Sequence, residues 1–142
     1  MKLFHIFLFQ FLILFSSYCQ IKIPDVLLDI PDHVKKRIMK IIDKNNFSGI
    51  FNSHDVNYIS NELDMNLYQV MELLRPISRT YAKAPISNYM VGAVCRGGSG
   101  NMYFGSNIEI LGESINLTLH AEQSAVINAW LHGETKINSI NV

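Results

Sequence analysis

The chain has 142 residues, which is enough for one domain of ordinary size and too few for two comfortable ones. Because 49% of the residues are hydrophobic and 17% are charged, the chain can bury a core, which excludes wholesale disorder. Twelve basic residues balance twelve acidic ones, so the basic excess of a nucleic-acid-binding protein is absent and we expect no nucleic acid as a partner. With only two cysteines, Cys19 and Cys95, a scaffold of several disulfides is also excluded.

Residues 1–19 have the pattern of a secretory signal peptide. Lys2 precedes an apolar stretch from Leu3 to Phe15, and small residues follow at Ser17 and Cys19. As a helix this stretch would span ~20 Å, less than the ~30 Å of a bilayer core, so we expect no stable membrane anchor. A buried first helix and a mistaken upstream start are the alternatives. Secretion would make the glycosylation sequons at Asn46 and Asn116 relevant, although such short motifs often occur by chance.

Two amphipathic helices are predicted between residues 20 and 84. After an extended lead-in over 20–30, residues 32–45 carry apolar side chains at helical spacing, namely Val34, Ile38, Ile41 and Ile42. Residues 45–57 are expected to form a loop that runs into a short helical turn. The second helix begins near Asn66, is kinked or restarted at Pro76, and stops before Pro85. Its apolar face consists of Leu67, Val70, Met71 and Leu74.

From Pro85 onward the pattern changes to alternating strands and helix. Residues 89–94 predict a buried strand, 96–100 a glycine-rich turn, and 101–106 the returning strand of a hairpin. Because this turn joins two strands rather than opening a helix, a phosphate site is not expected there. A helix from about Leu117 to Leu131 and a strand over 137–142 complete an α/β layer.

Four polar residues of this region are candidates for chemistry. His120 and Glu122 stand at the start of the predicted helix, and Asn107 and Glu109 follow the second strand. Residues two apart on a helix point in different directions, so one of the first pair could hold a metal while the other faces a substrate. On residue types alone, such a pair is more often structural, and Asn107 and Glu109 equally fit an ordinary polar strand end.

Three segments carry a resemblance to a known family. Residues 84–93 (APISNYMVGA), 97–109 (GGSGNMYFGSNIE) and 119–134 (LHAEQSAVINAWLHGE) resemble, in order and spacing, motifs of the cytidine deaminases, in particular the larger homodimeric kind of enteric bacteria and plants. The resemblance implies a three-layer α/β/α fold with a mixed sheet, C-terminally incomplete here and preceded by N-terminal helices. The corresponding organisation is a signal peptide over 1–19, a helical segment over 20–84 and a partial catalytic domain over 85–142.

The resemblance also implies roles for individual residues. His120 would be a zinc ligand, and Glu122 would be the proton shuttle for a zinc-activated water that attacks C4 of cytosine. Asn107 and Glu109 would hold ribose hydroxyls, and Tyr89 would lie edge-on to the base. The implied reaction is hydrolytic deamination of cytidine, and of deoxycytidine, in pyrimidine salvage, by a homodimer in the full-length form.

The sequence departs from the family pattern at its end. The family's P-C-x-x-C motif would follow Val142, so His120 is the only zinc ligand of that set in this chain. We therefore expect the chain alone to be inactive and poorly stable, with an unpaired edge at strand 137–142. Two other interpretations stay open: a non-catalytic relative that acts as a binding or dimer-partner module, and a small secreted α/β protein with chance matches. Location is likewise open, because the family implies the cytoplasm and residues 1–19 imply secretion.

Overall fold

The computed structural model describes residues 27–44 and 48–142. The predicted signal peptide, Cys19 and the sequon at Asn46 lie outside these residues. Within them, no helix is both long and apolar enough to cross a membrane. The elements in chain order are α3 (Asp32–Lys44), β1 (Ile50–Phe51), α4 (Ser53–Glu62), α5 (Leu67–Arg79), β2 (Gly92–Gly97), β3 (Met102–Ser106), the short 3-10 helix η1 (Ile115–Leu117), α6 (Ala121–Leu131) and β4 (Ile137–Asn141).

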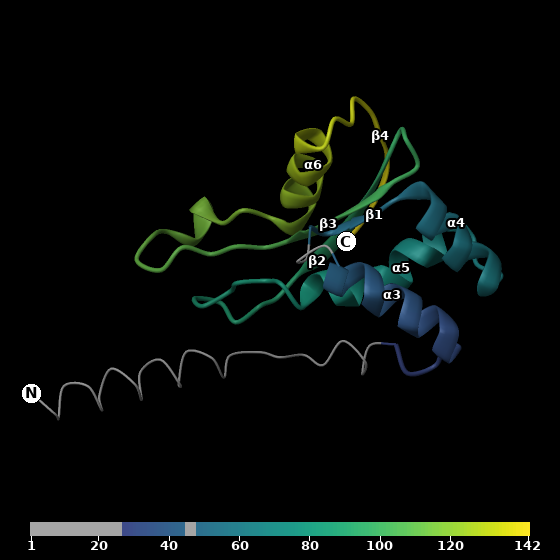
Figure 1. Cartoon of the computed structure of the whole chain (residues 1–142). Coiled ribbons are helices and arrows are strands. Elements are labelled where there is room, and N and C mark those ends of the chain that lie inside the picture. The colour runs from purple at the N-terminus through teal and green to yellow at the C-terminus, as the bar shows by residue number, and fades with distance from the viewer. Residues whose placement is uncertain (1–26, 45–47) are drawn as a thin grey trace, which may run out of the picture.

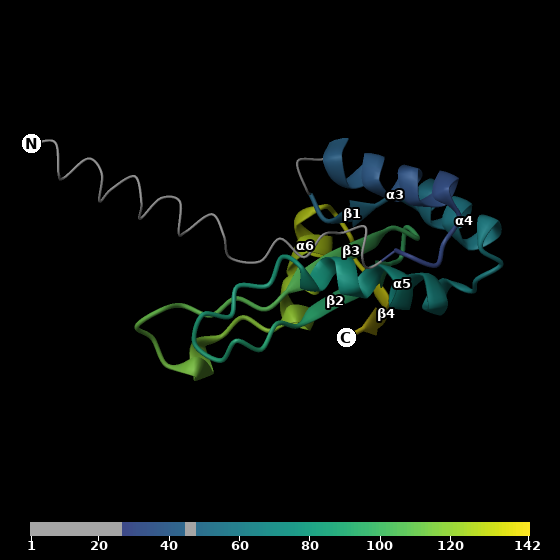
Figure 2. The ribbon, with the colours of Figure 1, turned by 90° about the horizontal axis from the view of Figure 1, so that it is seen from below.

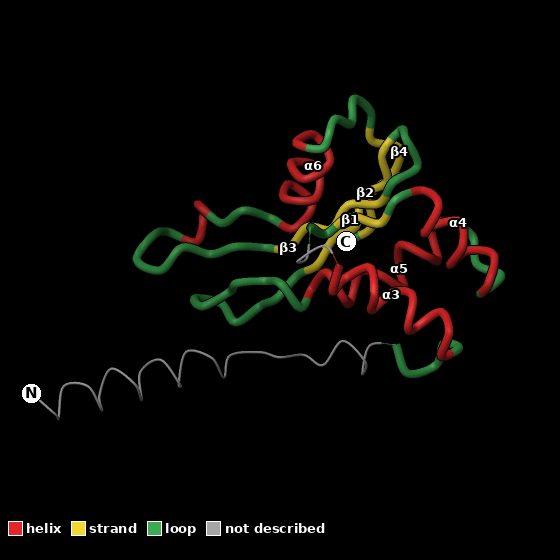
Figure 3. The backbone as a smooth tube through the Cα atoms, viewed as in Figure 1, coloured by secondary structure: helices red, strands yellow, loops and turns green. Residues whose placement is uncertain are grey.

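A four-stranded sheet with the order β1-β3-β2-β4 separates two helical layers, as Figures 1 and 3 show. β2 and β3 form the predicted hairpin, in which Val94 pairs with Phe104 and Cys95 with Tyr103. Helix α6 then crosses one face of the sheet and returns the chain as β4 beside β2. The α/β class and the layered arrangement are confirmed.

The sheet ladders of the described residues differ from the mixed pattern that we expected. β1 with β3, β3 with β2, and β2 with β4 all pair antiparallel. The crossover through α6 does make β4 parallel to β3, but β2 lies between them, so no neighbouring strands of the sheet run parallel. Over residues 27–44 and 48–142, parallel pairing occurs only in an isolated bridge between Lys83 and Ile108.

Helices α3, α4 and α5 form the layer on one face of the sheet (Figure 2). Helix α5 begins with a capping box, in which Asn66 accepts from the Gln69 N–H and Gln69 accepts from the Asn66 N–H. Its apolar side is buried against strand residues such as Val94 and Phe104. Pro76 lies inside this helix, which continues to Arg79, so of the kink or restart that we expected there the restart does not occur.

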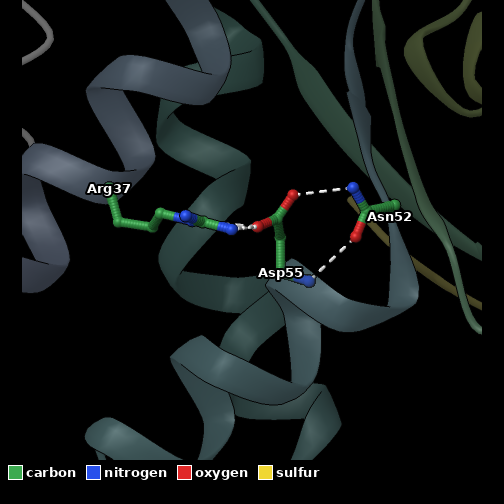
Figure 4. Close-up of polar contacts among 3 residues, drawn as sticks. All are labelled: Arg37, Asn52 and Asp55. Carbon is green, nitrogen blue, oxygen red and sulfur yellow. Dashed lines mark hydrogen bonds and ion pairs between the residues drawn. The ribbon is translucent and has the colours of Figure 1, made fainter.

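Two elements before α5 were not predicted as such. Residues 50–51 form β1, where Ile50 pairs with Tyr103 and Phe51 with Met102, and the expected short helical turn is the full helix α4. Asn52 caps α4 by accepting from the Asp55 N–H at 2.9 Å. As Figure 4 shows, the buried Asp55 carboxylate also binds Arg37 of α3, with the Arg37 Nη2 at 2.5 Å. This ion pair between side chains links α3 to α4.

Helix α6 lies on the opposite face and approaches the sheet closely. Its buried residues are Ala121, Ala125 and Ala129, spaced four apart on one side of the helix. At Gly105 of β3, a Cβ atom would overlap the Ala121 carbonyl oxygen and the Ala125 nitrogen, so only glycine fits. Small residues on both partners therefore set the depth at which the start of α6 rests on the sheet.

Candidate active site

Asn107 lies just beyond β3 and is bound to the segment that leads into β2. It is 6% exposed, its Oδ1 accepts from the Val91 N–H at 2.8 Å, and its Nδ2 donates to the Tyr89 carbonyl at 2.9 Å. Both ends of the amide are thus used by backbone groups on either side of Met90. Asn107 therefore fixes the path of the chain at Tyr89.

Glu109 is the second residue that holds this segment. Its carboxylate accepts from the Ile86 N–H at 2.8 Å, the Ser87 N–H at 3.0 Å, and the Ser87 hydroxyl. The hydroxyl bond is the main cause that lowers the pKa of Glu109, against the opposing effect of burial. Glu109 is therefore held as a carboxylate, which can only accept hydrogen bonds.

The segment over 84–91 is itself a compact turn. The Asn88 N–H donates to the Ala84 carbonyl at 2.9 Å, and Asn88 has φ of +57°, a left-handed conformation that asparagine tolerates. The Tyr89 N–H donates to the Ser87 hydroxyl oxygen at 3.0 Å. Tyr89 follows this turn with 71% of its surface exposed, so its ring is presented to solvent.

A small three-stranded extension brings the predicted segments together. Ile108 and Leu119 exchange two backbone hydrogen bonds of 2.9 and 3.0 Å, while Lys83 bonds to the backbone on both sides of Ile108. Because Ile108 separates Asn107 from Glu109, and Leu119 precedes His120, the backbone of His120 lies beside that of the N-x-E element. Figure 3 shows these loops projecting together from the sheet.

His120 and Glu122 occupy different surroundings at the start of α6. His120 is the exposed N-cap residue, and its N–H donates to the Gln123 Oε1 at 3.0 Å. Glu122 lies in the first turn and is half-buried. It lines a groove of about 470 Å³ with Leu119, Gln123, Val126, Ile127, Trp130 and Ile140. His120, Asn107, Glu109 and Tyr89 are not among the residues that line this groove.

Tyr89 borders a separate hollow of about 330 Å³. Its other lining residues come from the end of α5, the start of β2 and Val142, and include Arg75 and Arg79. The structure thus places Asn107 and Glu109 together, puts His120 near them along the backbone, and leaves Glu122 and Tyr89 each beside another depression.

The residues that the structure describes do not form a metal centre by themselves. Among the described residues, no group of three or more His, Cys, Asp or Glu side chains could hold a metal ion. Cys95 is buried on β2, where its thiol donates to the Ala125 carbonyl at 3.2 Å, and burial raises the pKa of this thiol to about 11. A metal ligand must be a thiolate, so Cys95 does not complement His120. A catalytic zinc takes three protein ligands, and this donor set does not fit one.

Two serines that the sequence did not single out support the site. Ser87 binds Glu109, as described above. Ser124 of α6 accepts from the Ser106 N–H at 2.7 Å and donates to the Ser106 carbonyl at 3.0 Å, which ties the helix to the end of β3. Ser87 could have been singled out because it lies within the APISNY motif. No sequence pattern marks Ser124 as a residue that supports the site.

Comparison with known proteins finds sequence similarity to proteins named cytidine deaminase. No family model matches the chain. The cytidine deaminase of Photobacterium profundum is 37% identical over 121 residues, which cover 85% of this chain and 41% of that protein. The cytidine deaminase of Histophilus somni is 40% identical over 102 residues, which cover 72% of this chain and 34% of that protein.

Solved structures give matches of the same kind. The cytidine deaminase of Burkholderia pseudomallei has a TM-score of 0.47 and 29% identity, covering 54% of this chain and 59% of that one. For the Mycobacterium tuberculosis cytidine deaminase the values are 0.48 and 25%, with 51% and 58% covered. The curated proteins that this chain matches by sequence are named cytidine deaminases. The chain spans about two fifths of the length of these relatives.

Proposed function

We propose that this chain carries the nucleoside-binding part of a cytidine-deaminating site, together with its histidine ligand and its proton shuttle. The observation that carries the proposal is the joining of three motif segments by the Lys83–Ile108–Leu119 extension. The same segments belong to a chain that shares 33–40% identity with proteins named cytidine deaminase. The substrate class is therefore a pyrimidine nucleoside, cytidine or deoxycytidine.

The contacts of Glu109 support a role in holding ribose, and those of Asn107 support a role in holding the backbone beside the base. A carboxylate has about four lone-pair directions. The three hydrogen bonds that reach Glu109 come from Ile86 and Ser87, which leaves acceptor capacity for a sugar hydroxyl. The lowered pKa of Glu109 keeps that acceptor ionised. Asn107 positions the backbone at Tyr89, whose exposed ring would lie against the base.

His120 and Glu122 would serve the reaction centre when it is complete. In the family, zinc supplies the activation of the attacking water. The described residues offer this metal one imidazole, so we derive no step through it. What Glu122 contributes on its own is a half-buried carboxyl group at the N-terminal turn of α6, from which it could pass a proton. We therefore expect the 142-residue chain not to turn over cytidine.

A second candidate function is a non-catalytic binding or dimer-partner module. It is favoured by the contrast between the intact hydrogen bonding of Asn107 and Glu109 and the absence of further metal donors among the described residues. Under this alternative the chain binds the nucleoside, or a partner, without hydrolysing it.

Calorimetry with cytidine and deoxycytidine, paired with an assay for uridine formation in the presence of zinc, tests the proposal. We expect binding without turnover, and a Tyr89→Ala variant that binds at least tenfold more weakly. Tyr68→Ala is the matched control, because Tyr68 is also an exposed tyrosine (55%) but lies on α5. Absence of nucleoside binding would contradict the proposed substrate class. Turnover, or a zinc content near one per chain, would contradict the incomplete metal site.

A further inference from the structure

The end of strand β3 has no neighbouring strand on one of its sides. β1 pairs with β3 only at Met102 and Tyr103. One residue further on, the Phe104 N–H donates to the Gly49 carbonyl at 2.7 Å on the same side. Because backbone groups two residues apart in an antiparallel strand point the same way, the N–H and carbonyl of Ser106 point to this side as well. Among the described residues no strand pairs with Ser106 there, so both groups need other partners.

A side chain of α6 supplies both of these partners. The Ser124 hydroxyl oxygen accepts from the Ser106 N–H at 2.7 Å, and the hydroxyl donates to the Ser106 carbonyl at 3.0 Å. The same hydroxyl proton has a second acceptor, the Ala121 carbonyl, at 3.2 Å. A residue of a neighbouring antiparallel strand would likewise offer one acceptor and one donor. Ser124 thus takes the place of a strand residue beyond the end of β1.

The end of β3 is also held from the opposite face of the sheet. The Ser106 hydroxyl donates to the Ser78 carbonyl of α5 at 2.6 Å. Ser78 is fully buried, and its own hydroxyl lies within hydrogen-bond distance of the carbonyls of Ala93 and Gly105. Hydrogen bonds from both helical layers therefore meet at Ser106, the residue directly before Asn107.

We propose that Ser124 is a positioning residue of the nucleoside site and acts on it through Ser106 and Asn107. This inference rests on the proposed function. The Asn107 side chain accepts from the Val91 N–H at 2.8 Å and donates to the Tyr89 carbonyl at 2.9 Å. A shift at the end of β3 would move this amide, and the backbone that presents Tyr89 would move with it.

The same serine connects the two motif elements of the site. The Ser124 N–H donates to the His120 carbonyl at 3.0 Å, so the Ser124 hydroxyl lies one helical turn from the H-x-E element. Through Ser106 the hydroxyl is bonded to the start of the N-x-E element. An alanine at position 124 would keep the apolar contacts of α6 but would leave two backbone groups of Ser106 without their partner.

Amide hydrogen exchange of the full chain, measured by NMR without nucleoside, tests this chain of contacts. In Ser124→Ala we expect exchange to be about tenfold faster at Ser106, which loses its bond, and at Val91, whose bond to Asn107 loosens. Calorimetry should show that the affinity for cytidine falls by about tenfold as well. Ser124→Cys keeps the size of the side chain but is a weaker donor and acceptor, so both effects should be intermediate.

Asn128→Ala is the matched control. Asn128 also lies on α6, and its Nδ2 donates to β3 at the Phe104 carbonyl at 3.1 Å. This bond is one helical turn further from Asn107, so its loss should leave the exchange at Val91 and the affinity for cytidine unchanged.

Faster exchange confined to Ser106, or an affinity for cytidine that Ser124→Ala leaves unchanged, would overturn the proposal. Equal effects of Ser124→Ala and Asn128→Ala at Val91 would also overturn it, because Ser124 would then be one structural contact among others. If the unmodified chain does not bind cytidine, the proposed function is contradicted instead. Exchange at Val91 then still decides whether Ser124 positions Asn107.

Discussion

The two faces of the sheet are packed by different kinds of residue. On the α5 face, large side chains such as Leu74, Ile77 and Phe104 fill the space between sheet and helices. On the α6 face, three alanines meet Ala93, Cys95 and Tyr103, and the larger apolar side chains of α6 point outward. The α5 face gains its stability from buried volume, whereas α6 is placed by close approach of its backbone to the sheet.

This difference matters for the candidate site, because His120 and Glu122 stand at the start of α6. A helix whose backbone at Ala121 and Ala125 rests against Gly105 of β3 has little freedom to move toward or away from that strand. The polar residues Asn107 and Glu109 follow the same strand. Close packing on the α6 face therefore sets the position of the H-x-E element relative to the N-x-E element.

The largest expected effect is on the α5 face. Leu74→Ala removes a fully buried side chain from the main core and should lower the free energy of unfolding by about 3 kcal/mol. Urea titration followed by circular dichroism measures this loss. Leu28→Ala is the control, since Leu28 is 69% exposed and its truncation should change stability by less than ~0.5 kcal/mol. Equal effects of the two variants would contradict the assignment of the core.

On the α6 face, added volume rather than a cavity should lower the free energy of unfolding. Gly105→Ala forces a Cβ into the α6 backbone and should cost about 2 kcal/mol, because a helix backbone cannot yield as a flexible side chain does. Gly98→Ala is matched to it, since the added Cβ makes only an ordinary contact of 3.4 Å with Lys136. Denaturant unfolding of both variants separates crowding from the general effect of adding a methyl group. A neutral Gly105→Ala would contradict close packing of α6.

Periodicity predicted the parts of the fold that bury a continuous apolar side. It predicted α3, α5, the second strand of the hairpin, the later part of α6 and β4 close to their observed bounds. The first strand of the hairpin was predicted over 89–94 and lies three residues later, at Gly92–Gly97. It missed β1, because the two residues Ile50 and Phe51 are a strand only through their pairing with Tyr103 and Met102, far along the chain. It also underestimated α4, whose capping residue Asn52 precedes a segment with a weak apolar pattern.

The candidate site was predictable from motifs only at the level of segments. The N-x-E and H-x-E elements identified Asn107, Glu109, His120 and Glu122, and the structure brings the backbones of these segments together at Ile108. The bonds from Ser87 to Glu109 join residues 22 apart, and no spacing rule encodes such a contact. The roles of the five site residues stay predictions until nucleoside binding is measured.

A partly buried ion pair between Arg37 and Asp55 lies among the helices that cover the α5 face. Asp55→Ala should cost about 2 kcal/mol, because it removes the bonds to Arg37 Nε at 3.0 Å and to Asn52 Nδ2 at 2.7 Å from a carboxylate that is 5% exposed. Asp32→Ala is its control, since Asp32 is highly exposed and lies 3.7 Å from Lys35, where a surface pair contributes ~0–0.5 kcal/mol. Thermal unfolding of both variants distinguishes the buried from the exposed interaction.

The smallest change in stability is expected from loss of an acid-sensitive hydrogen bond on the α6 face. The Glu134 carboxylate accepts from the Ser99 hydroxyl and from the Tyr103 hydroxyl at 3.0 Å. The Ser99 bond is the main cause that lowers the pKa of Glu134. Because the pKa is lower in the folded state, the stabilisation is present above the unfolded value of about 4.5 and is lost as the pH falls through the folded value.

Ser99→Ala should therefore lower the free energy of unfolding by about 1 kcal/mol at pH 7, as expected for one hydrogen bond, and the difference from the unmodified chain should shrink toward pH 3. Unfolding titrations at pH 7, 5, 4 and 3 give this profile. Ser139→Ala offers a comparison that should be insensitive to pH, because its hydroxyl donates to the Met71 sulfur, which does not titrate. A Ser99→Ala effect that is constant from pH 7 to pH 3 would show that the ionisation of Glu134 does not depend on this bond.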